Sequence, residues 1–367
     1  MRTALSDQLG LAHPIFAFTP SEHVAAAVSR AGGMGVLGCV RFNDAEELDA
    51  VLNWMDENTD GKPYGVDIVM PAKVPTEGTP ADLAKYIPDE HRRFVSDTLH
   101  KLGVPPLPAD GDPAADGVLG WLHSVARAHV EVALHHPIKL IANALGSPPK
   151  DVIDQAHERD VPVAALAGKA KHARAHVDNG VDIVIAQGTE AGGHTGEIAT
   201  MVLVPEIVDA VGTDGAVLAA GGIGSGRQIA AALALGAAGV WMGSYWLTAS
   251  EYTLGAGDTM QRALVSAGSD QTVRSRIYSG KPARLLKTKW TDAWSEPGAP
   301  EPLPMPLQNL LVTEAHQRIM RSQDPEVVAM PVGQIVGRMN SVRPAAELVH
   351  GLVAELEETL ARLDKLR

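Results

Sequence analysis

Short apolar runs rich in β-branched residues recur along the chain, separated by amphipathic stretches. The clearest run lies within residues 182–188, where Ile183 to Ala186 are continuously apolar and Gly180 comes just before them. Such a run indicates a strand buried on both faces. The stretches between the runs place apolar residues three and four positions apart, which predicts helices with one buried face.

A helix that ends at glycine, followed within two to four residues by a strand, is a repeated unit of this sequence. It occurs at residues 30–36, 178–183 and 234–240. Glycine just past a helix end is the usual left-handed stop, and the short loop is typical of β/α units. Repetition of the unit with apolar strands implies a parallel sheet. The predicted strands are 14–18, 34–38, 64–70, 138–145, 162–168, 182–188, 216–223 and 239–247.

Eight such units predict an α/β fold of the TIM (β/α)8 barrel type, spanning residues 1–254. A doubly wound open sheet would show fewer units, and the GxGxxG spacing is absent after the first strand. Residues 71–137 interrupt the pattern after strand 3 with prolines and two helical stretches, 89–102 and 117–135. This segment predicts a helical insertion over the barrel mouth or an interface.

The remaining residues, 255–367, predict an irregular and helical C-terminal extension packed on the barrel. Residues 255–335 are irregular and Pro-rich, whereas 344–363 form an amphipathic helix with leucines on one face. This helix either packs on its own barrel or makes a homodimer contact, and the pattern alone leaves both readings open.

Composition narrows the function classes. The formal net charge of -13 argues against nucleic acid or an anionic membrane surface as a partner. The single cysteine, Cys39, excludes an internal disulfide and suggests a reducing compartment. No secretory signal and no apolar run of about 18 residues is seen, so a cytoplasmic protein is expected.

The candidate chemistry lies in residues 182–196, where a glycine-rich polar loop follows a buried strand. The loop presents Gln187, Glu190 and His194 at the carboxyl end of that strand, where parallel α/β folds bind ligands. An imidazole with its ordinary pKa near 6.5 suits proton abstraction at neutral pH. The alternative is an ordinary glycine-rich turn whose histidine is hydrogen-bonded to backbone.

Two further glycine clusters follow strands seven and eight, at residues 221–226 and 241–244. TIM barrels commonly bind phosphate between these two loops, at a helix N-terminus. Bare amides at Gly222, Gly224 and Gly243, with the hydroxyl of Ser244, are candidate phosphate donors. No P-loop spacing is present, which disfavours ATP or GTP.

Other chemistries have weaker support. His135 and His136 lack a third ligand at metal spacing, so no metal site is predicted. A serine hydrolase is disfavoured because no G-x-S-x-G motif stands at a strand–helix turn.

The stretch AQGTEAGGHTG resembles the signature of the nitronate monooxygenase family, formerly called 2-nitropropane dioxygenases. These are FMN-dependent TIM-barrel enzymes, and flavin-type enoyl-ACP reductases and some NAD(P)H:quinone reductases share the signature. The stretch AAGGIGSGRQIAAALALGAAGVWMGSYWL resembles the family's flavin-phosphate segment, and AGGMGVLG and SGKPARLLK are also similar to family segments. The resemblance implies that His194 is the catalytic base and that Gln187 and Gly192 contact the flavin. It also implies mainly backbone contacts to the phosphate from Gly221, Gly222, Trp241, Met242, Gly243 and Ser244.

Two departures from the family pattern concern the flavin environment. Phe18-Thr19-Pro20 stands where family members usually read Ala-Pro-Met, and Asp67 stands where the family often has asparagine. If Asp67 faces the flavin, its carboxylate would disfavour negative charge on the reduced ring, or its own pKa would rise.

Three functions follow as hypotheses. The first is oxidation of alkyl nitronates by O2 to a carbonyl compound and nitrite, with His194 as base for neutral nitroalkanes. The second is an FMN-dependent NAD(P)H oxidoreductase that acts on an enoyl or ring-containing thioester or on a quinone. The third is a barrel that binds a phosphate metabolite without redox chemistry.

Overall fold

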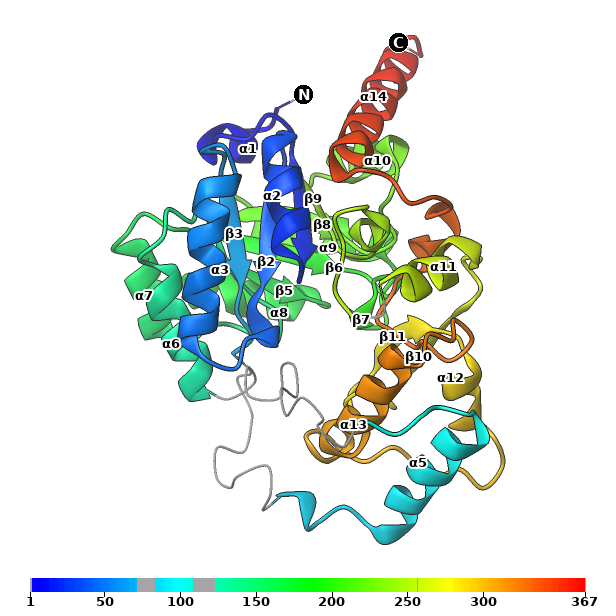
Figure 1. Cartoon of the computed structure of the whole chain (residues 1–367). Coiled ribbons are helices and arrows are strands. Elements are labelled where there is room, and N and C mark those ends of the chain that lie inside the picture. Colours follow the sequence, from blue (N-terminus) through cyan, green and yellow to red (C-terminus); the bar gives the residue numbers. More distant parts are fainter. Residues whose placement is uncertain (1, 71–82, 108–122, 256, 367) are drawn as a thin grey trace.

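Eight parallel strands close into a barrel in the order β1-β2-β3-β4-β5-β6-β8-β9 (Figure 1). This computed structural model describes residues 2–70, 83–107, 123–255 and 257–366. The strands are β1 (Ile15–Thr19), β2 (Met34–Gly38), β3 (Tyr64–Asp67), β4 (Ile141–Asn143), β5 (Val163–Ala167), β6 (Ile183–Gln187), β8 (Ala216–Ala220) and β9 (Gly239–Met242). The barrel closes through the pairing of β1 with β9. The predicted TIM barrel is therefore confirmed.

All eight predicted strands are present, but several are shorter than predicted. The strand predicted at 138–145 is limited to Ile141–Asn143, and the last two strands end at Ala220 and Met242. The seventh barrel strand, β8, ends early because Gly221 adopts a φ of 104°. This backbone conformation turns the chain away from the neighbouring strands. The 3-10 helix η2 (Ser244–Thr248) replaces the end of the strand predicted at 239–247.

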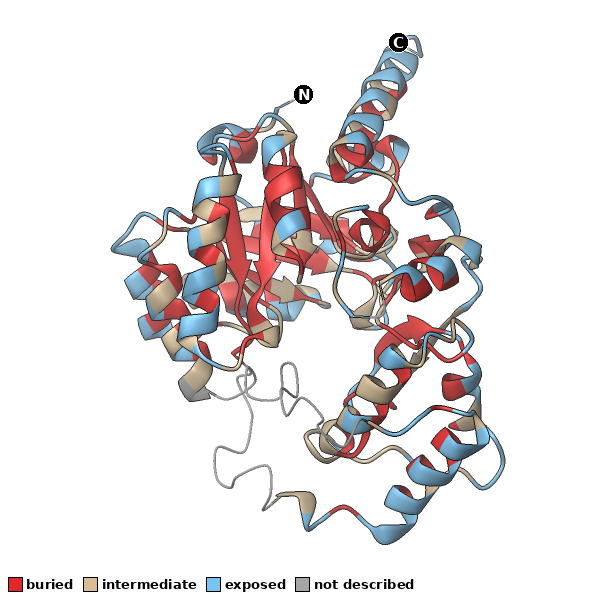
Figure 2. Cartoon of the chain, in the orientation of Figure 1, coloured by how far each residue is buried: buried red, intermediate tan, exposed pale blue. Residues whose placement is uncertain are grey.

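Helices surround the barrel, and buried residues concentrate in its strands and on the inner faces of these helices (Figure 2). The helix α6 packs against α3 and occupies the ring position between β3 and β4. The second helical stretch predicted for the insertion thus contains a barrel helix, and its first part, 117–122, lies outside the described residues. The ring consists of α2 (Glu22–Arg30), α3 (Ala45–Asn58), α6 (His123–Ala133), α7 (Lys150–His157), α8 (Ala170–Asp178), α9 (Thr200–Val211) and α10 (Gly226–Ala234), and the short helix α1 (Ala4–Gln8) precedes β1.

The helix α5 (Asp89–Lys101) lies away from the ring and packs on α13 (Leu307–Arg321) of the C-terminal segment (Figure 1). Val95 and Leu99 form its buried face. The guanidinium of Arg318 on α13 donates to the carbonyl of Val104 at 2.9 Å, just after α5.

The C-terminal segment is more regular than the Pro-rich sequence predicts. A three-stranded antiparallel sheet joins β10 (Thr272–Ser275), β11 (Ala283–Leu286) and the two-residue strand β7 (Gly193–His194). The other elements are α11 (Asp258–Ser266), α12 (Lys289–Ala293), α13, the 3-10 helix η3 (Gln334–Arg338) and α14 (Ala345–Asp364). Pairing with β7 ties this segment to the loop that follows β6.

The C-terminal helix α14 packs on α10 and α2 of the same chain. Leu348, Leu352 and Leu356 are buried there, so the barrel itself covers most of the apolar stripe noted in the sequence. The stripe is thus accounted for by intramolecular packing, and Leu363 near the helix end is exposed.

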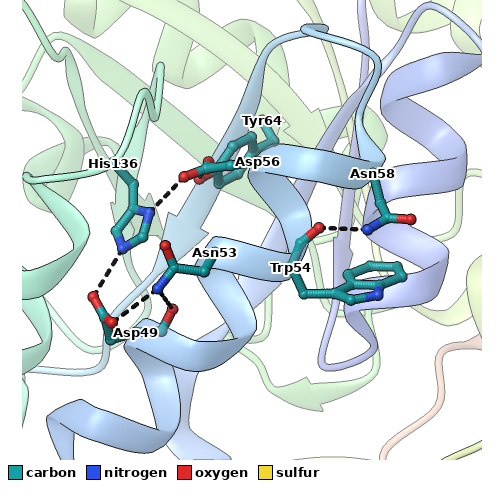
Figure 3. Close-up of polar contacts among 7 residues, drawn as sticks. All are labelled: Asp49, Asn53, Trp54, Asp56, Asn58, Tyr64 and His136. Carbon is teal, nitrogen blue, oxygen red and sulfur yellow. Dashed lines mark hydrogen bonds and ion pairs between the residues drawn. The ribbon is translucent and has the colours of Figure 1, made fainter.

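A partly exposed polar bridge links α3 to the chain around β3 and β4 (Figure 3). The ring of His136 lies between two carboxylates, with Nδ1 2.7 Å from Asp56 and Nε2 3.2 Å from Asp49. The Tyr64 hydroxyl donates to the other Asp56 oxygen at 2.6 Å. The bridge links α3 to the segment before β4, which gives this histidine a structural role.

Within the described residues no group of three His, Cys, Asp or Glu is placed to hold a metal ion. A search of the same residues finds no helix with the length and apolarity to cross a membrane.

Candidate active site

Alternation along the strands determines which side chains line the barrel mouth. Phe16, Val36, Ile185 and Leu218 belong to the cluster that fills the barrel interior, whereas Tyr64 and Val66 pack outside against helices. Because successive side chains of a strand point to opposite faces, the position after Val66 on β3 faces the interior. The residues brought together at this carboxyl-terminal level are Phe18, Asp67, Gln187 and Trp241. The Phe18 and Trp241 rings are stacked with centroids 6.2 Å apart.

Asp67 is a buried carboxyl at this mouth, with 3% of its surface exposed. Burial raises the pKa of Asp67 to about 7, because the charged form loses hydration. The neighbouring Cys39 thiol is also buried, and its pKa is raised by burial and by the charge of Asp67. The sequence expectation of a raised carboxyl pKa thus agrees with the geometry, and this acid is partly protonated at neutral pH.

The loop after β6 is held by a carboxylate and a guanidinium. The Glu190 carboxylate accepts hydrogen bonds from the amide of Thr200 at 3.0 Å and from its hydroxyl at 2.8 Å, at the start of α9. Arg284 of β11 donates to the carbonyl of Thr189 at 2.9 Å. Glu190 therefore orients the loop rather than facing the barrel axis as a free acid.

His194 lies at the end of this loop, in β7, directly opposite Ala283 of β11. Its Nε2 lies 2.6 Å from the Ser279 hydroxyl, and its ring contacts Tyr278 edge-on at 6.4 Å between centroids. Burial, assisted by the charge of Lys281, lowers the pKa of His194 to about 4. The imidazole is therefore neutral at physiological pH and can accept a proton, but it is a weaker base than the ordinary pKa near 6.5 considered from the sequence.

The loops after β8 and β9 present backbone amides. Within the described part of the chain, no hydrogen bond engages the N–H groups of Gly222, Ile223, Gly243 or Ser244. Gly222 adopts a φ of 68°, and a Cβ there would lie 3.2 Å from the Glu190 Cβ. Unengaged backbone donors of this kind, next to a helix N-terminus, are typical of phosphate-binding loops.

One predicted phosphate donor needs correction, and two further predicted contacts, Ser244 and Gly192, also touch the C-terminal segment. The Gly224 amide donates to the Gln228 side chain at 3.0 Å, so it is not a bare donor. The Ser244 hydroxyl accepts from the Gly333 amide at 2.8 Å, and its own proton can still serve as the predicted donor. Gly192 lies against the C-terminal segment, because a Cβ there would lie 2.8 Å from the Val332 and Gly333 backbone. Close packing of two backbones requires the glycine at 192.

Sequence reasoning missed Ser279 and Tyr278 as neighbours of His194. They lie about 85 residues further along the chain, and only the pairing of β11 with β7 brings them to the loop. The sequence did contain a signal for Ser279, because the stretch SGKPARLLK that begins with it is similar to a family segment.

The sequence of this chain matches a known protein family. A sequence model of the nitronate monooxygenase family matches residues 2–355. The chain belongs to the nitronate monooxygenase family. The family consists of flavin-dependent oxidoreductases, so the chain is an enzyme of that class and the resemblance noted in the sequence is confirmed.

Named relatives differ in their described activity. A Mycobacterium tuberculosis protein named as a monooxygenase is 48% identical and covers 100% of this chain and 99% of its own length. A second protein of that organism is 32% identical over 79% of this chain and 67% of its own length, and is named a hydroxy-methyl-oxo-octahydro-indene-carboxyl-CoA dehydrogenase. A Staphylococcus aureus protein named as a nitronate monooxygenase is 25% identical and covers 98% of both chains.

Solved structures agree in fold along almost the whole chain. A nitroalkane oxidase from Streptomyces ansochromogenes is 28% identical with a TM-score of 0.81, covering 98% of this chain and 100% of its own. FabK from Thermotoga maritima is 26% identical with a TM-score of 0.74 and covers 100% of both chains.

Proposed function

We propose that this protein is an FMN-dependent monooxygenase that oxidises alkyl nitronates with O2 to a carbonyl compound and nitrite. The observation that carries the proposal is the neutral imidazole of His194, held by Ser279 at the same end of the barrel as the unengaged amides of the β8 and β9 loops. Membership of the nitronate monooxygenase family and the nitroalkane oxidase fold support it.

The residues present fit an FMN phosphate. The N–H groups of Gly222, Ile223, Gly243 and Ser244 would donate to its oxygens, and among the described residues no acidic side chain is hydrogen-bonded to them. Gln187 at the end of β6 and Trp241 near the end of β9 would border the flavin ring system. When bound, the flavin supplies the redox chemistry, whereas the protein positions the substrate and controls charge.

The histidine is needed only for one form of the substrate. A nitronate is already an anion, whereas a neutral nitroalkane must first lose its α-proton. Neutral His194 accepts that proton, and the Ser279 contact at Nε2 fixes the orientation of the ring. The Lys281 charge that lowers the pKa of His194 also favours an anion bound beside it.

Nitrite release and oxygen uptake test this proposal directly. The flavin-loaded protein is supplied in air with ethyl nitronate or with neutral nitroethane, and without any nicotinamide. We expect nitrite from the nitronate, and slower release from nitroethane that depends on His194. Absence of nitrite from every alkyl nitronate tried would reject the function.

A second candidate is an FMN-dependent NAD(P)H oxidoreductase that acts on an enoyl or ring-containing thioester or on a quinone. The observation that favours it is the 32% identical relative, whose name describes a carboxyl-CoA dehydrogenase. FabK, at 26% identity, also shares the fold. Substrate-dependent oxidation of NADPH without nitronate turnover would select this candidate.

A further inference from the structure

One segment of this acidic chain is strongly basic. Residues 274–289 contain no acidic residue, although the whole chain carries a formal net charge of -13. Six of these sixteen residues are cationic: Arg274, Arg276, Lys281, Arg284, Lys287 and Lys289. A polyanion is repelled by the net charge of the molecule and attracted to such an edge.

The basic segment borders the candidate active site. It contains the end of β10 and the whole of β11, which lie next to β7 (Figure 1). β11 pairs with β7 so that Ala283 lies opposite His194. The connection between the two strands contains Ser279, whose hydroxyl contacts the His194 ring. The connection is therefore fixed beside the reacting end of the barrel.

The cations of the segment differ in how they are neutralised. Lys289 pairs with Glu326, and Lys287 lies 3.9 Å from Asp292. Arg276 and Lys281 are exposed and have no ion pair within the described ranges of the chain. Arg276 donates only to the carbonyl of Gly280, at 3.0 Å, which places its guanidinium next to the residue before Lys281.

A third cation of the segment is buried and forms no ion pair with any of the residues that the structure describes. Arg284 is 9% exposed and donates to the Thr189 carbonyl and to the Thr272 hydroxyl. It lies directly opposite Arg274 in the β10–β11 pair. Arg274 has one weak acidic contact, 3.8 Å from Glu197, and its Nε is buried without a hydrogen-bond partner. Acidic contacts on this edge go to Arg274, Lys287 and Lys289, so the exposed charge left for a ligand is that of Arg276 and Lys281.

We propose that Arg276 and Lys281 bind the phosphate groups of a nucleotide-bearing reactant, an acyl-CoA or NADPH, whose reactive end enters the barrel beside His194. Guanidinium and ammonium groups form charge-assisted hydrogen bonds with phosphate oxygens. The proposed oxidation of alkyl nitronates uses neither reactant, so the inference rests on the second candidate under the proposed function, with His194 marking the reacting end of the barrel.

Binding of two nucleotide fragments to the FMN-loaded protein tests the inference. Adenosine 3′,5′-bisphosphate represents the nucleotide of coenzyme A, and adenosine 2′,5′-bisphosphate represents that of NADPH. Calorimetry measures each affinity for the wild-type protein, for R276Q/K281Q and for the control K287Q/K289Q, whose lysines have acidic partners. We expect R276Q/K281Q to bind at least about tenfold more weakly, and the control to bind within about twofold of wild type.

The fragment that binds more tightly identifies the reactant. Binding of neither fragment, or equal binding by wild type and R276Q/K281Q, would overturn the inference. These results do not use turnover, so they remain readable if the protein releases no nitrite and the proposed function fails.

Discussion

The two sides of the barrel mouth are built from different kinds of group. Beside β8 and β9, the unengaged donors are backbone amides of residues 222–223 and 243–244, close to the ends of adjacent strands. Beside β6, the candidate reactive groups are side chains of His194 and Ser279, 85 residues apart in sequence. The first side depends on backbone geometry, above all on the positive φ of Gly222, whereas the second depends on individual side chains and on the β7–β11 pairing.

The largest effect on activity is expected from His194→Asn, on the side of the mouth built from side chains. Loss of the base should lower turnover of neutral nitroalkanes by about 10²- to 10⁴-fold, while turnover of preformed nitronates falls much less. Bound flavin should be retained, because the imidazole is not one of the phosphate donors. Steady-state nitrite release with both substrate forms and the flavin absorbance measure this.

The exposed His350→Asn on α14 serves as the matched control and should leave both rates unchanged. Equal loss with nitroalkane and nitronate would show that His194 does not act as a base.

The next effect should appear on the backbone side, from Gly222→Val. A valine at a φ of 68°, with its Cβ 3.2 Å from Glu190, strains the loop and crowds the amides. FMN affinity should fall about tenfold to a hundredfold, measured by quenching of flavin fluorescence. Gly61→Val is the control, since Gly61 has the same φ of 68° and open space around it. Unchanged FMN affinity in Gly222→Val would remove the phosphate site from this loop.

Ser279→Ala should have a smaller effect on the same side-chain cluster. One hydrogen bond to Nε2 is lost, which should reduce kcat for nitroalkanes by roughly 2- to 10-fold without altering flavin binding. The pH profile of kcat should change as well, because Ser279 contacts a titrating nitrogen. Ser275→Ala, in β10 of the same sheet, is the control. A nitroalkane pH profile identical to that of wild type would contradict the positioning role.

The smallest effect concerns Asp67→Asn. The pKa of Asp67 is about 7 when folded and near 3.8 ordinarily, so the unfolded chain releases its proton more readily. This carboxyl therefore destabilises the fold increasingly as pH rises from about 4 to 7. Asparagine should raise the free energy of unfolding by roughly 1–3 kcal/mol at pH 8 and by less at pH 5, measured by urea unfolding.

Asp97→Asn, at an exposed position on α5, should change stability little at either pH. A gain for Asp67→Asn that is the same at pH 5 and pH 8 would show that Asp67 is not a buried acid with a raised pKa.

Local pattern was sufficient to predict the barrel. Continuous apolar runs such as 183–186 and glycines after helices mark each β/α unit, and the glycine clusters after the last two strands mark the amide side of the mouth. The ends of strands were predicted less well, because φ at Gly221 and the turn at Gly243 decide them rather than side-chain type.

The C-terminal half of the site was not predictable in the same way. Neither β10 nor β11 has a strong period, and they are held by pairing with β7, a contact between segments far apart in sequence. Ser279 acquires its place beside His194 only through that pairing. The role of Gly192 was assigned to the cofactor because nothing local reveals the approach of residues 332–333.

The most direct test of the central claim is an anaerobic absorbance titration of the purified, FMN-loaded protein. The account predicts that the oxidised flavin band bleaches on addition of propionate 3-nitronate alone, with no nicotinamide present. A protein that fails to take up FMN, or whose flavin bleaches with NADPH and not with the nitronate, would contradict it.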